Sequence, residues 1–133
     1  MPLGNVVGEF TVKITSLKQT ELSGGQIRVE MDTAGEATGL VTGQNMGTLV
    51  AEVTPGKPSP FHVTGMVLPA SGAPTRYSAW GIGVGGAENH KVRLRGTVRY
   101  LGDDPKTATM IGAVEAEVDL KGMTIKGALC EWT

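Results

Sequence analysis

The sequence alternates strictly between apolar and polar side chains over residues 91–100, and this pattern restricts the possible folds more than any other feature. Val92, Leu94, Val98 and Tyr100 occupy one set of alternate positions, and three arginines and a threonine occupy the other. A period of two is typical of a half-buried β-strand, because successive side chains of a strand point to opposite faces. The run therefore predicts a strand with an apolar inner face and a basic outer face.

A second alternating run, over residues 113–119, complements the first. Its apolar positions alternate with three acidic side chains, Glu115, Glu117 and Asp119. Opposite charges on neighbouring strands stabilise an antiparallel pair. We therefore predict that residues 92–100 pair antiparallel with residues 113–120, with their charged side chains outward.

Short strands separated by turn residues are expected along the rest of the chain. The expected ranges are 9–20, 26–33, 47–54, 61–68, 76–84 and 123–132, with 36–39 as a separate strand or a bend. Glycine accounts for 20 of 133 residues, about double its usual share of roughly 7%. Glycines inside strands, such as Gly65, Gly81, Gly96 and Gly127, mark sharp bends or close backbone approach, and a small closed barrel requires such bends. We predict one all-β domain over residues 1–133, an antiparallel barrel of about eight strands with little or no helix, preceded by a short tail at 1–6.

Composition and charge exclude several classes of function. The net charge of −1 gives no basic surface for nucleic acid, and no apolar run approaches the roughly 20 residues that span a membrane. The first residues lack the basic and apolar regions of a signal peptide. Cys130 is the one cysteine, so no intrachain disulfide can form. We expect a cytoplasmic protein with neither a nucleic-acid nor a membrane partner.

Two short motifs have structural explanations. Residues 81–86 match the spacing G-x-G-x-x-G, but a dinucleotide site needs a helix next, and the basic strand follows instead. His62, His90 and Cys130 do not have the spacing of metal ligands. Cys130 is interpreted as a small buried residue rather than a nucleophile. No metal and no cofactor is expected.

Four segments carry a resemblance to a known family. They are Gly-Thr-Leu-Val-Ala-Glu-Val-Thr-Pro-Gly (47–56), Arg-Leu-Arg-Gly-Thr-Val-Arg-Tyr (93–100), Met-Ile-Gly-Ala-Val-Glu-Ala-Glu-Val-Asp (110–119) and Cys-Glu-Trp (130–132). In this order they resemble small uncharacterised bacterial proteins whose fold is similar to the allene oxide cyclase barrel. The resemblance implies an eight-stranded barrel and oligomers, and it implies no established activity.

A pocket inside the barrel is one expectation from the inward residues. An eight-stranded barrel can either be filled by side chains or hold one small ligand. Small residues at Gly81, Gly83 and Gly96 would leave room beside their neighbours. The large aromatic side chains could wall such a pocket or simply pack the core; they are Tyr77, Trp80, Tyr100 and Trp132.

Three charged residues are candidates for the polar part of that pocket. Glu52 lies in an otherwise uncharged run, and Glu131 precedes Trp132 near the chain end. A carboxyl group in apolar surroundings has a raised pKa, which suits acid–base chemistry, whereas both side chains could equally point to solvent. Arg95 could reach the barrel mouth at a bend beside Gly96, or it could pair with the acidic strand.

Three functions remain open after this reasoning. The first is binding of a small apolar molecule inside the barrel, with Glu52, Tyr77, Trp80, Arg95, Tyr100 and Trp132 as ligand-binding residues. The second is a cofactor-independent cyclase or isomerase that shapes its substrate, with Glu52 or Glu131 as catalytic residues. The third is a structural or interaction module with a filled barrel.

The charge distribution also predicts self-association. Residues 37–87 contain three charged residues, Glu52, Lys57 and Arg76, and their apolar residues fall on both faces of the expected strands. A sheet with one solvated face alternates polar and apolar residues, which these strands do not. We expect a homo-oligomer, a dimer or a trimer, joined through them.

Overall fold

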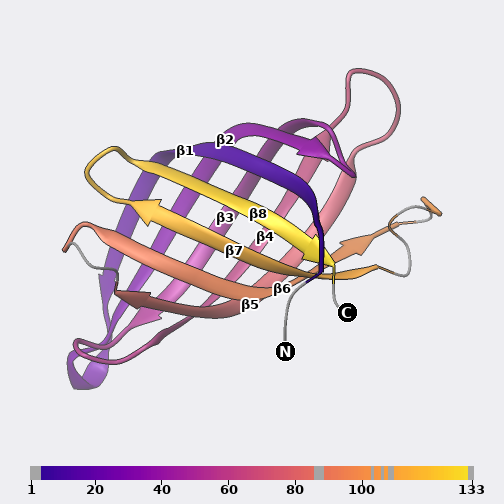
Figure 1. Cartoon of the computed structure of the whole chain (residues 1–133). Helices are drawn as coiled ribbons and strands as arrows, with labels where there is room; N and C mark the ends of the chain where they lie inside the picture. The colour runs from indigo at the N-terminus through magenta and orange to yellow at the C-terminus, as the bar shows by residue number, and fades with distance from the viewer. Residues whose placement is uncertain (1–3, 86–88, 103, 106, 108–109, 132–133) are drawn as a thin grey trace.

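A computed structural model describes residues 4–85, 89–102, 104–105, 107 and 110–131. Its strands form a closed antiparallel barrel in which each strand pairs with the next and β8 returns to pair with β1 (Figure 1). The strands are β1 Val6–Glu21, β2 Ile27–Gly39, β3 Gly43–Val53, β4 Ser59–Leu68, β5 Thr75–Gly85, β6 Lys91–Leu101, β7 Ile111–Asp119 and β8 Thr124–Glu131. A single 3-10 turn, Ser23–Gly25, joins β1 to β2, and no helix of the described residues is long and apolar enough to cross a membrane. The all-β, eight-stranded prediction is confirmed.

The predicted pairing between the basic and acidic strands is also confirmed. In the antiparallel register of β6 and β7, Arg93 lies opposite Glu117 and Arg95 lies opposite Glu115. The Arg95 Nε atom is 3.6 Å from Oε1 of Glu115, and both side chains are exposed. Such exposed pairs stabilise a fold by only about 0–1 kcal/mol each. Their larger effect is on register, because a slip of one residue would turn the arginines inward.

The region of β2 and β3 differs from the expected strand boundaries. The segment 36–39 is neither separate nor a bend, because β2 runs without interruption to Gly39. The next strand, β3, begins at Gly43 rather than at residue 47, and it pairs with β2 along its length. The expected tail at 1–6 is shorter in its described part, since β1 begins at Val6 and the Gly4 amide already donates to the Glu131 carbonyl at 2.9 Å.

Glycine pairs allow neighbouring strands to approach closely. Gly81 on β5 lies opposite Gly96 on β6. A Cβ atom on Gly81 would lie 2.0 Å from the Arg95 carbonyl oxygen, and one on Gly96 would lie 2.2 Å from the Trp80 carbonyl oxygen. The prediction that these glycines mark close backbone approach is confirmed. The expectation that they leave empty space is wrong, because the backbone of the adjacent strand occupies that space.

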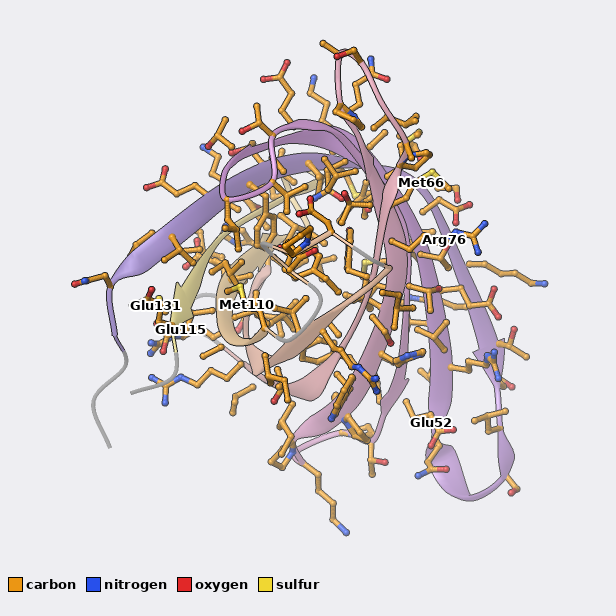
Figure 2. All side chains as sticks on the ribbon, turned by 90° about the vertical axis from the view of Figure 1, so that its right-hand side faces the viewer. Glu52, Met66, Arg76, Met110, Glu115 and Glu131 are labelled. Atoms are coloured by element: carbon orange, nitrogen blue, oxygen red, sulfur yellow. The ribbon has the colours of Figure 1, made fainter. Side chains whose placement is uncertain are left out.

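The apolar core fills the middle of the barrel. Its main cluster joins side chains from seven strands, and a smaller cluster of Ala79, Val98 and Leu129 lies toward the end that holds the β6–β7 connection. Met110, which precedes β7, packs against the smaller cluster and lies at that end in Figure 2. The inward side chains thus form layers that divide the interior along its axis.

Candidate functional site: two chambers inside the barrel

The barrel interior contains two apolar chambers. Chamber one, with a volume of about 110 Å³, lies at the end of the barrel that faces the viewer in Figure 2. Chamber two, with a volume of about 370 Å³, lies at the opposite end. Leu49, Phe61 and Leu94 line both chambers, so this layer of three side chains separates them. The barrel interior is therefore not completely filled.

Chamber one has mainly aliphatic and aromatic walls. All eight strands contribute to it, including Val12 of β1, Val67 of β4 and Leu129 of β8. Its volume is of the same order as the roughly 150 Å³ of an apolar protein cavity that holds one benzene molecule. The chamber therefore has space on the scale of one small apolar molecule.

A buried polar pair lies inside this apolar chamber. The Tyr77 hydroxyl on β5 donates a hydrogen bond to Oδ1 of Asn45 on β3 at 2.5 Å. Asn45 is buried, and no other hydrogen bond of its side chain is found within the described residues. Among the described residues, no side-chain nitrogen or oxygen that is fully buried lacks a hydrogen-bond partner. The Asn45 amide nitrogen has no such partner, so it must be accessible from the chamber. Asn45 lines the chamber, so its amide nitrogen is available to donate a hydrogen bond to an occupant.

Tyr100 adds a second hydroxyl to chamber one. Its ring meets the Tyr77 ring edge to face, with the centroids 6.3 Å apart. No hydrogen bond of the Tyr100 hydroxyl is found within the described residues, although the side chain is largely buried. An apolar chamber in which two polar groups lack full partners is the usual design of a small-molecule site.

Burial sets the protonation state of both tyrosines. It raises the pKa of Tyr100 to about 12. The pKa of Tyr77 also rises to about 12, mainly through burial and further through the neighbouring Tyr100, while the hydrogen bond with Asn45 opposes the shift. Both hydroxyl groups are therefore protonated at neutral pH, where they can donate hydrogen bonds but cannot act as bases.

The structure places two of the expected ligand-binding residues in chamber one and three elsewhere. Tyr77 and Tyr100 line the chamber. Trp80 lies on the outer face of β5 and is 45% exposed, because the inward positions of that strand are Tyr77 and Ala79 and the side chains alternate. Arg95 is also on the outer face, where it pairs with Glu115. The register thus corrects the expected inward positions of Trp80 and Arg95.

The two candidate catalytic carboxylates do not lie in either chamber. Glu52 is exposed on the outer face, opposite Arg28 of β2, and Figure 2 shows it outside the barrel wall. Its position follows from Leu49 and Ala51, which face inward and force Glu52 outward. Glu131 is exposed at the end of β8, and Trp132 lies outside the described residues. An acid–base role for Glu52 or Glu131 inside the barrel is therefore not supported by the geometry.

Sequence reasoning missed Asn45, the buried polar residue of chamber one. The sequence predicts a strand over 47–54, which leaves Asn45 in the connection before it. A signal was nevertheless present: Asn45 is four residues before Leu49, so an extended strand would place both on the inner face. The Gly-Gln-Asn-Met-Gly sequence hid this relationship, because glycine and asparagine usually indicate turns.

An exposed apolar surface occupies the outer face of β5. Trp80, Ile82 and Val84 are 45%, 50% and 47% exposed, and Met46 on β3 is 36% exposed. His62 of β4 lies opposite Trp80 and its Nε2 atom is 2.9 Å from the Ser78 hydroxyl oxygen. This is the surface through which the sequence predicts self-association, and the association itself stays a prediction.

The described residues do not form a cluster of side chains that could bind a metal ion. No group of three histidine, cysteine or acidic side chains gathers among them. Cys130 is a buried free thiol, as the sequence indicated.

Comparison with known proteins gives a fold relationship. No protein-family model and no curated protein matches the sequence. The crystal structure of a conserved protein of unknown function from Rhodopseudomonas palustris is similar, with a TM-score of 0.80 over 98% of each chain and 15% sequence identity. The two chains share a fold. At this identity the likeness concerns the eight-stranded barrel alone, and function has to be argued from the chambers.

Proposed function

We propose that the protein binds a small, mainly apolar molecule carrying one hydrogen-bonding group, and that it holds this molecule in chamber one. The observation that carries the proposal is the Tyr100 hydroxyl, which lacks a described protein partner beside the Tyr77–Asn45 pair. A ketone or aldehyde oxygen would accept a hydrogen bond from Tyr100 or from the Asn45 amide. Burial of the apolar part would supply roughly 25 cal/mol per Å² of covered surface before association costs.

Binding is favoured over the other two candidate functions. The open interior supports a ligand site rather than a filled structural module. A cyclase or isomerase that uses a carboxylate or another base is less favoured, because Glu52 and Glu131 lie outside the chambers and both tyrosines remain protonated and cannot act as bases. We also propose that the chain is related to the allene oxide cyclase-like barrels; support comes from the closed eight-stranded topology and the four resembling segments.

A nuclear magnetic resonance titration tests the proposal with two probes of equal size. Cyclohexanone has a carbonyl group, and methylcyclohexane has the same number of heavy atoms and no polar group. We expect cyclohexanone to shift the backbone amide signals of chamber-one residues and to bind more tightly than methylcyclohexane. Tyr100→Phe keeps the ring and should lower the affinity for the ketone about twofold to tenfold, as expected for the loss of one hydrogen bond.

Thr64→Val is the matched control, because it removes a hydroxyl group from the outer face of β4. It should leave the ketone affinity unchanged. The proposal fails if neither probe shifts the chamber-one signals. It also fails if the ketone and the hydrocarbon bind equally well to the unmodified protein.

A further inference from the structure

Chamber two differs from chamber one in size and in the charge at its rim. Its volume of about 370 Å³ is more than three times that of chamber one. On the scale of the roughly 150 Å³ cavity that holds benzene, it has room for about ten to fifteen carbon atoms. Its walls are apolar, with Val29, Val53 and Val118 among them.

A single cation lies at the rim of chamber two. Among the described residues that line the chamber, Lys57 is the one that is charged, and it is exposed. No ion pair or hydrogen bond of its ammonium group is found within the described residues. Gln19 and Ser59 add neutral polar groups to the same lining. As far as the described residues go, the chamber therefore combines an apolar interior with one positive charge that has no partner.

The turn that carries Lys57 fixes its place at the rim. Thr54, Pro55, Gly56 and Lys57 form a tight turn between β3 and β4, in which the Lys57 amide donates to the Thr54 carbonyl at 3.1 Å. Gly56 has a φ of 75°, and proline followed by such a glycine is the signature of a type II turn. All four residues line the chamber, so the turn holds the lysine backbone directly at its mouth.

The charge at the opposite mouth has the other sign. Among the described residues that line chamber one, Glu9 is the one that is charged, and it is exposed. Opposite charges at the two mouths attract different molecules, because an approaching anion is drawn toward Lys57 and repelled by Glu9. We therefore expect the two ends of the barrel to favour molecules of different charge.

We propose that chamber two is a separate binding site for an organic anion with an apolar body. The body enters the chamber and displaces water from its walls, and the anionic group remains at the rim beside the Lys57 ammonium. This inference does not depend on the function proposed for chamber one, because the layer of Leu49, Phe61 and Leu94 separates the two sites.

Calorimetric titration with two probes of the same ring system tests the charge preference. 2-Naphthoate carries a carboxylate, and 2-naphthalenemethanol is its neutral counterpart. We expect 2-naphthoate to bind more tightly, and its affinity to fall with added salt while that of the alcohol stays constant. Lys57→Gln should lower the affinity for 2-naphthoate about fivefold, as expected for an exposed ion pair, and Lys57→Arg should restore it.

Lys13→Gln is the matched control, because Lys13 is an exposed lysine on β1 and does not line either chamber. It should not change the affinity for 2-naphthoate. The proposal is overturned if the unmodified protein does not bind 2-naphthoate. Equal affinities of the Lys57→Gln and Lys13→Gln variants would overturn it as well.

A pair of filling substitutions locates the two sites. Ala51 lines chamber two alone, and Ala79 lines chamber one alone. Ala51→Leu should weaken 2-naphthoate binding and spare cyclohexanone binding, whereas Ala79→Leu should do the reverse. If either variant does not fold, the amide signals of Val53 and Val118 in the unmodified protein report the same location. Loss of 2-naphthoate binding in Ala79→Leu, or unshifted signals of both valines, would contradict the placement in chamber two.

Discussion

Tyr77 reaches across one whole strand to bond with Asn45. The two residues belong to β5 and β3, and the tyrosine ring passes over Gly65 of the intervening strand β4. A Cβ atom at Gly65 would lie 2.6 Å from the Tyr77 ring, so glycine is needed there for the ring to pass. The relationship therefore links three strands through one hydrogen bond and one aromatic contact over glycine.

Removal of the Tyr77 hydroxyl should destabilise the barrel. In Tyr77→Phe the Asn45 oxygen loses its partner in a mainly apolar chamber, which costs about 1–2 kcal/mol of the free energy of unfolding. Urea denaturation measures the change. Tyr100→Phe is the comparison, because no described partner of its hydroxyl is lost, and it should cost less. Equal losses in the two variants would argue against a structural role of the Tyr77–Asn45 bond.

The close approach of β5 and β6 should make Gly81 intolerant of any side chain. Gly81→Ala would place a methyl group 2.0 Å from the Arg95 carbonyl oxygen, and we expect a loss of at least about 2 kcal/mol in the free energy of unfolding. Gly85→Ala on the same strand meets nothing within 4 Å and should be nearly neutral. Thermal denaturation of both variants gives the comparison, and similar melting temperatures would show that the strands do not approach this closely.

Alkaline pH should weaken the fold through Tyr77 and Tyr100. Both have a pKa of about 12 in the folded protein, against the ordinary tyrosine value of 10.0. The unfolded chain therefore releases these protons first, so their contribution to stability is complete below pH 10 and is lost as pH rises toward 12. The free energy of unfolding should fall by at most about 1.4 kcal/mol per pH unit for each tyrosine in this range.

Urea denaturation at several pH values across that window measures the slope. Tyr100→Phe should roughly halve it, because one of the two titrating groups is removed. Ultraviolet absorption of tyrosinate follows the ionisation directly. A stability that is constant over the same pH range would contradict the burial of the two rings.

Self-association through the outer face of β5 is a further expectation. Ile82 is 50% exposed beside Trp80 and Val84, and a second copy that covered these side chains would remove them from water. Light scattering at micromolar concentration should report a dimer or trimer for the unmodified protein and a monomer for Ile82→Lys. Thr11→Lys, on the exposed outer face of β1, should leave the oligomer intact. A monomeric unmodified protein would refute the expectation.

The sequence predicts the architecture much better than the contents of the barrel. On β6 and β7 one face is apolar and the other charged, so alternation assigns both the strands and their inward faces. On β5 both faces are apolar: Tyr77 and Ala79 face inward, while Trp80 and Ile82 face outward. Hydrophobicity cannot choose between such faces, and for this reason Trp80 was expected in the chamber.

The polar pair of chamber one depends on information that no local pattern contains. The register of β3, β4 and β5 brings Tyr77 and Asn45 together, and the lack of a side chain at Gly65 leaves room for the tyrosine ring between them. Glu52 shows the opposite case. A carboxylate within an apolar run looks buried, although its neighbours Leu49 and Ala51 take the inward positions and leave it outside.

The layer of Leu49, Phe61 and Leu94 makes the length of the interior adjustable. Phe61 is the largest of the three side chains, and it stands between the two chambers. Replacement of this ring by a smaller side chain would join the two chambers into one continuous cavity. The number of strands, their register and the charges at the rims would not change. Barrels of this type could therefore evolve from holding two short molecules to holding one long molecule through a single substitution, which makes position 61 the natural place to search for divergence among relatives.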